Sequence, residues 1–135
     1  MTEELVTLET AKLLKEKGFN EYCKYVISDK GLMMETIFRT SKDLPKSFYS
    51  CPMQSIAQRW LRENKNLHVL STPKVVESYN KIGEVVKTEV EFYYWDIYVV
   101  GSNKHKHIIQ NCFTNQFNTY EEALEAGIQE ALKLI

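Results

Sequence analysis

The C-terminal segment, residues 119–135, constrains the fold of this chain more than any other. Its apolar residues recur at intervals of three and four, as on one side of an α-helix: Tyr120, Ala123, Leu124, Ile128, Ala131, Leu132 and Ile135. Thr119 and Glu122 have the spacing of a capping box, in which each side chain bonds a free backbone amide at the helix start. Such a stripe must pack against a sheet or other helices, so the segment predicts a folded globular protein.

Composition is consistent with one domain spanning residues 1–135. A chain of 135 residues has the usual size of a single domain, and 44% hydrophobic with 26% charged residues is typical of globular proteins. Seventeen basic residues stand against eighteen acidic ones. A general electrostatic attraction to nucleic acid is therefore not predicted, because it requires a surplus of Lys and Arg.

Cysteine usage and the N-terminus predict a cytoplasmic location. The three cysteines are an odd number without C-x-x-C spacing, which favours a reducing compartment: Cys23, Cys51 and Cys112. The first residues are acidic and lack the apolar core of a signal peptide. No apolar run approaches the length of a membrane span, so no membrane partner is expected.

Two further helices are predicted. Thr7 is placed to cap a helix over Leu8–Lys17, and Gly18 suits the left-handed residue that ends it. Pro52 is expected at the first position of the second helix, where a missing amide costs nothing. The apolar stripe of this second helix consists of Met53, Ile56, Ala57, Trp60 and Leu61.

Segments rich in β-branched and aromatic residues lie between the helices. The predicted strands are residues 22–28, 32–38, 67–71 with a continuation over 75–79, 85–100, and 106–113. Asp29-Lys30-Gly31 and Asn80-Lys81-Ile82-Gly83 are the connecting turns of hairpins, residues 39–50 are expected to be a loop, and the third strand is expected to end before Pro73. The order α-β-β-α-β-β-β-α with hairpin connectors predicts an α+β fold, with an antiparallel sheet of four to five strands covered on one face by the three helices.

Three stretches, taken together, resemble a family of small proteins common in gut Bacteroidales and in their phages and prophages. They are residues 8–19, residues 54–63, and residues 120–127 with 129–132. The likeness spans most of the chain in order. Thr usually precedes the Gln-Ser pair in that family, whereas Met53 stands there in this chain and removes a capping hydroxyl. The resemblance implies an origin in a phage or another mobile element, in which case the cytoplasm is that of the host cell. It carries no activity that transfers.

Catalytic and metal-binding signals are weak. His105 and His107 would share one strand face, and a third metal ligand would have to come from His68, Cys112 or Asp96. An exposed turn beside Lys104 and Lys106 is the simpler interpretation. We therefore predict no metal site, no catalytic residue and no cofactor.

Cys51 is the best placed nucleophile among the cysteines. It precedes Pro52 at the start of a helix, where the helix dipole lowers a thiol pKa. A nucleophilic cysteine also needs a base and an orienting group, and no such signature surrounds Cys51. A buried small side chain or a helix cap is the alternative role.

The aromatic run over residues 92–98 is the strongest sign of a binding surface. In a strand, Phe92, Tyr94, Asp96 and Tyr98 share one face, and Tyr93, Trp95, Ile97 and Val99 share the other. The helices can cover only one face, so large rings are expected to reach solvent whichever face forms the core. Such rings are typical of binding surfaces, because they cover much area at a small cost in entropy. The candidate binding residues are Tyr93, Tyr94, Trp95 and Tyr98; the alternative is a thick core with scattered exposed tyrosines.

The polar side of the second helix is another candidate. Its residues offer amide and guanidinium donors for an anion, a nucleotide or an acidic patch: Gln54, Gln58, Arg59 and Arg62. A solvated helix face is the alternative. Asp96 has two interpretations as well, because it either faces water on the open side of the sheet or is a buried acid with a partner.

The leading functional hypothesis is a small non-enzymatic binding protein of phage or mobile-element origin, which modulates or sequesters a host component. Its partner would be a protein or a small-molecule ligand, and a homodimer formed through the aromatic surface is one form of this hypothesis. The first alternative is nucleic-acid binding through a local basic patch formed by Arg59, Arg62, Lys65 and residues 104–107. The second is a small enzyme that depends on a cysteine or a histidine.

Overall fold

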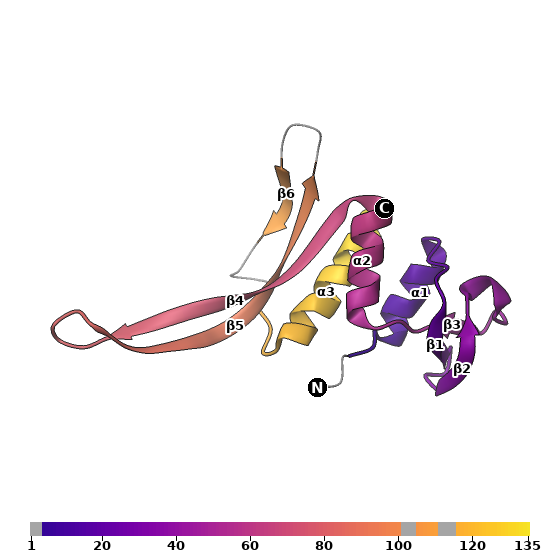
Figure 1. The fold of residues 1–135 in the computed structure, drawn as a ribbon, viewed down its shortest axis with the longest axis horizontal. Coiled ribbons are helices and arrows are strands. Elements are labelled where there is room, and N and C mark those ends of the chain that lie inside the picture. The colour runs from indigo at the N-terminus through magenta and orange to yellow at the C-terminus, as the bar shows by residue number, and fades with distance from the viewer. Residues whose placement is uncertain (1–3, 101–104, 111–115) are drawn as a thin grey trace.

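The structure is a computed structural model that describes residues 4–100, 105–110 and 116–135 (Figure 1). Within these residues its elements are α1 (Leu8–Glu16), β1 (Cys23–Ser28), β2 (Met33–Arg39), the single 3-10 turn η1 (Ser41–Asp43), β3 (Phe48–Ser50), α2 (Gln54–Lys65), β4 (Leu67–Tyr79), β5 (Val85–Val100), β6 (His105–Gln110) and α3 (Tyr120–Lys133). The α+β class and the predicted order of helices and strands are confirmed. The short strand β3 is an addition, because it lies inside the expected loop over residues 39–50.

The strands form two antiparallel sheets instead of the single sheet expected. One has the order β2-β1-β3, and the other has the order β4-β5-β6. The three helices lie between the sheets (Figure 1): α1 contacts β1 and β3, whereas α2 and α3 contact the sheet that contains β4. The expectation that all three helices cover one face of one sheet was therefore wrong, because helix α2 interrupts the chain between the two sets of strands.

The helix ends follow the predicted chemistry at two of three N-termini. The hydroxyl of Thr7 accepts a hydrogen bond from the backbone N–H of Thr10, and that of Thr119 accepts one from Glu122 at 3.1 Å. Helix α2 begins at Gln54 and not at Pro52, and Met53 occupies the N-cap position without a side-chain bond.

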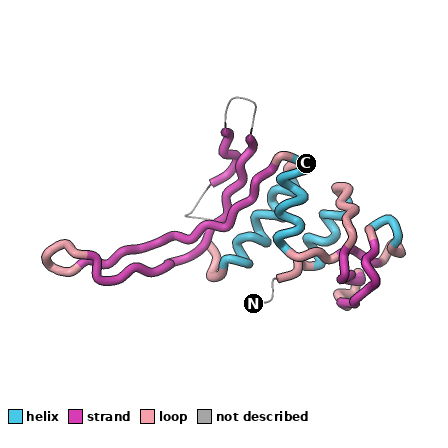
Figure 2. The backbone as a smooth tube through the Cα atoms, in the orientation of Figure 1, coloured by secondary structure: helices cyan, strands magenta, loops and turns pink. Residues whose placement is uncertain are grey.

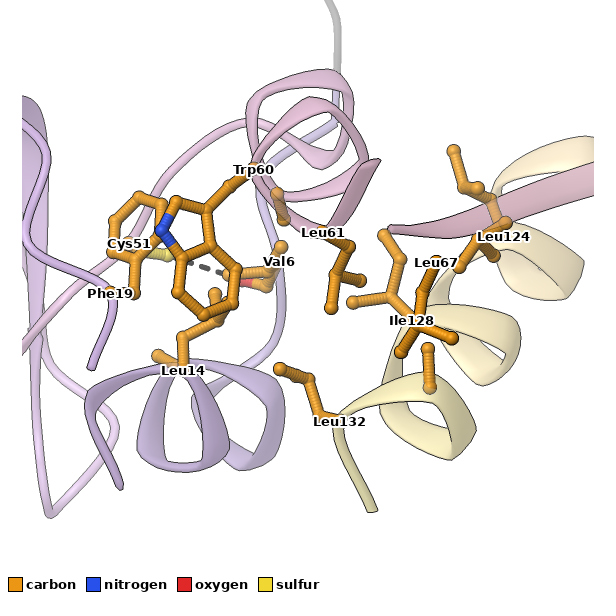
Figure 3. Close-up of a cluster of buried hydrophobic side chains, with 14 of the residues drawn as sticks. Val6, Leu14, Phe19, Cys51, Trp60, Leu61, Leu67, Leu124, Ile128 and Leu132 are labelled. Atoms are coloured by element: carbon orange, nitrogen blue, oxygen red, sulfur yellow. Dashed lines mark hydrogen bonds between the residues drawn. The ribbon is translucent and has the colours of Figure 1, made fainter. Parts of the chain in front are cut away.

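A continuous apolar core connects the helices to both sheets (Figure 3). Its largest fully buried side chains include Phe19, Leu14, Leu61, Ile128 and Leu132. The rings of Phe19 and Trp60 meet edge to face, with 5.6 Å between their centroids. The central residues of the stripes predicted on α2 and α3 therefore pack inward, as their spacing indicates, whereas the end residues Met53, Tyr120 and Ile135 are exposed.

Strand β4 runs through Pro73 without a break, although the sequence predicted an end there. β4 is an edge strand, paired only with β5 among the described residues. Pro73 stands opposite Tyr93, whose own N–H points away from β4 and bonds the carbonyl of Phe117 at 2.8 Å. Pro73 therefore occupies a position whose amide would point out of the sheet, so its missing N–H breaks no bond of the ladder.

Candidate functional site

The four polar residues predicted to form one binding surface on α2 do not all reach the surface, because Gln54 is buried. Only 3% of this residue is exposed, and its amide donates to the carbonyl of Glu121 and to Oε1 of Glu125, both at 2.9 Å. Oε2 of Glu125 accepts from the backbone N–H of Thr7 at 3.0 Å and from the hydroxyl of Thr10. Gln54 and Glu125 thus join the N-termini of α1 and α2 to α3, and Gln54 does not lie on the solvated face of α2 where the sequence placed it.

The other three candidate binding residues of α2 make different contacts. The amide of Gln58 donates to the carbonyl of Val69 at 2.7 Å and ties α2 to β4. Arg59 and Arg62 are exposed, and the guanidinium of Arg59 lies 3.5 Å from the carboxylate of Glu21. The amides of Gln54 and Gln58 are thus engaged within the protein, and of the four residues only the two arginines are exposed.

The structure decides which face of β5 forms the core. Ile97 is fully buried, and Trp95 is 8% exposed and lies beneath α3. Tyr93 on the same face is half-buried, and its ring meets that of Tyr120 edge to face at 6.3 Å. Trp95 is therefore a core residue that does not reach solvent as the sequence allowed, and Tyr93 is held against α3.

The opposite face of β5 presents the remaining candidate aromatics. Tyr94 and Tyr98 are half-buried, and the rings of Phe92 and Tyr94 lie 6.4 Å apart. Asp96 lies between these tyrosines and is only 3% exposed, with the hydroxyl of Thr72 donating to its carboxylate at 3.3 Å. Asp96 is thus the buried acid with a partner, the second of its two interpretations.

The cysteine interpretation is contradicted by burial. Cys51 is 1% exposed, and its thiol donates to the carbonyl of Val6 at 3.1 Å (Figure 3). Burial, followed by the proximity of Cys23 and Glu125, raises the pKa of Cys51 to about 12. Burial, with the charge of Glu21, raises the pKa of Cys23 to about 11. A thiol that holds its proton this firmly is a poor nucleophile at neutral pH, so Cys51 is a core residue.

Some residues of the predicted metal-binding and basic clusters lie outside the described part of the structure. This holds for Cys112 and Lys104 and for the side chains of His105, Lys106 and His107. Among the described residues, no three side chains of His, Cys, Asp or Glu gather as metal ligands. None of the helices in the described ranges is long and apolar enough to cross a membrane.

The sequence prediction missed a projecting two-stranded arm, which we define as residues 75–90. Figure 2 shows this part of β4 and β5 extending away from the helices, so that no helix or further strand of the described residues covers it. Its tip is ordered by Asn80, whose side-chain oxygen accepts from the N–H groups of Ile82 and Glu84 at 3.1 and 2.9 Å. Gly83 supplies the positive φ of 86° that closes the turn.

The two faces of the arm differ in chemistry. Directly opposed residues share a face, which places Val75 with Val90, Glu77 with Thr88, and Tyr79 with Val85 on one side. The other side carries the pairs Val76 with Glu89 and Ser78 with Lys87. The apolar residues of the first face and of the tip are all exposed, at 45–77%: Val75, Tyr79, Ile82, Val85, Val86 and Val90. We call these six residues the arm face.

The signal for the arm was present in the sequence but could not be interpreted there. Apolar and charged residues mix over residues 75–90, as they do in any half-buried strand. The sequence does not show that the helices end before they reach this pair of strands. Exposure of the arm is therefore a property of the tertiary structure.

Comparisons with protein-family models, with curated proteins and with solved structures found no match to this chain.

Proposed function

We propose that this protein is a non-enzymatic binding protein that buries the arm face against another protein. The observation that carries the proposal is the exposure of the six arm-face residues on a hairpin that nothing in the described structure covers. An isolated two-stranded hairpin is at best marginally stable in water. A partner that covers the arm would remove its apolar surface from water and would stabilise the hairpin.

The arm also offers free backbone edges. β6 pairs only with residues 96–100 of β5, so within the described ranges no strand pairs with either outer edge of residues 75–90. Unpaired edges of this kind recruit a further strand through main-chain hydrogen bonds. A strand added beside Val75 or Val90 would contact the arm face at the same time.

Energy estimates indicate that both contributions are needed. Covering the part of these six side chains that is exposed, roughly half of each or more, gains on the order of 5 kcal/mol. This gain is close to the cost of bringing two proteins together. Edge pairing or charge pairing must therefore add to the apolar contact. Charge of both signs is available, because residues 74–91 hold three lysines and four glutamates.

That balance of charge does not favour nucleic acid as the partner. A phosphate backbone is bound by a surplus of Lys and Arg, and the arm has one more acidic than basic residue. Arg59, from the predicted basic patch, is paired with Glu21. The partner we propose is therefore a protein. It is either a second copy of this chain or, following the resemblance to Bacteroidales and phage proteins, a protein of the host.

Light scattering tests the second copy first. If the arm face joins two copies, the measured mass rises from that of a monomer towards that of a dimer as the protein concentration increases. The double variant Val75→Thr/Val90→Thr should then raise the concentration at the midpoint of this transition by at least tenfold. Threonine keeps the shape and strand preference of valine but places a hydroxyl in the contact, at a cost of about 1–3 kcal/mol for each unpaired group. Val76→Thr, on the opposite side of the arm, is the matched control.

If the protein is a monomer, the same variants test a host partner. A tagged wild-type chain and the Val76→Thr control should then retain the same protein from a Bacteroidales lysate, and the double variant should lose it. A strict monomer whose bound proteins do not depend on Val75 and Val90 would remove the proposal.

A further inference from the structure

The outer edge of β5 is free along the arm. β6 pairs with residues 96–100 of β5, and the backbone of Tyr93 pairs with Phe117. From residue 92 to the tip, β4 lies on one side of β5, and no strand of the described residues lies on the other. The side chains of residues 85–91 are all exposed. A further antiparallel strand therefore has room to pair along this edge.

The residues of this edge are complementary to a second copy of themselves. Thr88 lies midway between Lys87 and Glu89, and the next residues outward are Val86 and Val90. If two copies of β5 pair antiparallel about a two-fold axis at Thr88, Lys87 of each copy lies opposite Glu89 of the other. Val90 of each copy then lies opposite Val86. Residues 87–90 form regular strand, because the register with β4 shifts on either side of them, at residues 86 and 91.

Symmetry excludes the outer edge of β4 from a similar arrangement. Opposed side chains share a face, and successive side chains of a strand alternate between faces. A two-fold axis can therefore oppose only residues that are an even number of positions apart. Lys74 and Glu77 on β4 are three positions apart, so no symmetric register places one opposite the other. On β5, an axis at Lys87 or Glu89 would oppose like charges, which leaves the axis at Thr88.

We propose that two copies of this chain join through the outer edges of β5, paired antiparallel about Thr88. This inference rests on the proposed function, because it names a second copy as the partner of the arm. The strands of the two arms then form one sheet, in the order β4-β5-β5-β4. The arm leads away from the helices (Figure 2), so the axis places the two sets of helices at opposite ends of this sheet.

The charges select the register, and the main chain supplies most of the affinity. Within one copy, Nζ of Lys87 lies 3.3 Å from Oε2 of Glu89, and both side chains are more than half exposed, at 64% and 54%. In the dimer each ammonium also meets the carboxylate of the other copy. Exposed ion pairs contribute little energy, so their effect is to disfavour the registers that oppose like charges. Hydrogen bonds along the edge and the contact of Val90 with Val86 hold the two copies together.

Two charge variants test this register by sedimentation analysis at low ionic strength. Lys87→Glu places the new carboxylate opposite Glu89 of the other copy, and Glu89→Lys places the new ammonium opposite Lys87. Each variant alone should dimerise about tenfold more weakly than the wild type, because both pairs across the axis become repulsive. An equal mixture of the two variants should recover the wild-type Kd as a heterodimer, since every opposed pair is then of opposite charge. A tag on one variant identifies the heterodimer by its mass.

The matched control changes the same charges on the other edge of the arm. Lys74→Glu/Glu77→Lys on β4 should leave the Kd unchanged. A second measurement keeps the native charges and uses Thr88→Cys, whose thiols would face each other across the axis at a distance that a disulfide spans. Oxidation should convert this variant to a covalent dimer. Glu77→Cys, which stands opposite Thr88 on β4, should give no more covalent dimer than the wild type.

The outcomes separate this inference from the proposed function. A wild-type protein that stays monomeric overturns the inference but leaves a host protein as the partner of the arm. A dimer that is weakened by Val75→Thr/Val90→Thr, but whose Kd does not respond to Lys87→Glu or Glu89→Lys, overturns the pairing about Thr88 and retains the arm face as the contact. A dimer that none of these changes affects contradicts both the inference and the second-copy form of the proposed function.

Discussion

Gly127 of α3 lies directly against Trp95 of β5. A Cβ atom placed on Gly127 would stand 2.9 Å from Cβ of Trp95 and 2.8 Å from Cγ1 of Val69. Real Cβ contacts are longer than this, so helix and sheet approach so closely only because residue 127 has no side chain. The close approach buries Trp95 and removes it from the surface on which the sequence prediction placed it.

The first prediction concerns this contact. Gly127→Ala should lower the free energy of unfolding by about 1–3 kcal/mol, because the added methyl overpacks the contact with Val69 and Trp95. Helix propensity alone predicts the opposite sign, a gain of about 1 kcal/mol. Denaturant unfolding measures the difference, and a stabilised variant would show that helix and sheet are further apart than described.

The second prediction concerns Glu125, whose carboxylate connects α3 to α1 and α2. Glu125→Ala should lower the free energy of unfolding by about 2–4 kcal/mol, because it removes charge-assisted hydrogen bonds and leaves the amide of Gln54 buried without this acceptor. Glu130→Ala is the control, since Glu130 makes a surface pair with Lys133 at 3.5 Å, which is worth less than about 1 kcal/mol. Equal effects of the two variants would contradict the structural role of Glu125.

The third prediction concerns the buried thiols. Cys23 and Cys51 should resist iodoacetamide at neutral pH in the native protein and react after unfolding, because their raised pKa values leave almost no thiolate. Peptide mapping by mass spectrometry assigns the reaction to each cysteine separately. Rapid native labelling of Cys51 would restore the nucleophile hypothesis.

The same thiols predict how stability changes with pH, which is our fourth prediction. Both pKa values lie above the ordinary value of 9.0, so the folded protein keeps protons that the unfolded chain releases. The contribution to stability is complete below about pH 9 and is lost as pH rises towards 11–12, by up to about 1.4 kcal/mol per pH unit for each thiol. Cys51→Ala should therefore lose stability less steeply above pH 9, which denaturant unfolding at several pH values measures.

The fifth prediction concerns the arm. Amides of residues 75–90 should exchange hydrogen faster than those of residues 67–71, although both segments belong to the same strand pair, because only the second is covered by helices. Exchange followed by mass spectrometry measures both. Protection that is uniform along β4 in a monomer would mean that the arm is stable without a partner, and it would weaken the reason for expecting one.

The elements themselves followed from local patterns in the sequence. The central parts of the stripes, around Leu61 and Ile128, pack inward, and Thr7 and Thr119 cap their helices. Both features were predictable because spacing and capping depend on neighbours three or four residues away. The hairpin turn at Asn80–Gly83 was predicted for the same reason. The α+β class followed from the order of these elements.

The tertiary structure alone decided which side chains meet. Whether Trp95 or Tyr94 faces the core depends on the position of α3, and whether Gln54 is solvated depends on how α2 meets α1 and α3. The two-sheet arrangement and the exposed arm likewise depend on contacts between residues far apart in the chain. Local sequence determines periodicity and turns over a few residues, whereas burial depends on where each helix ends relative to a distant strand.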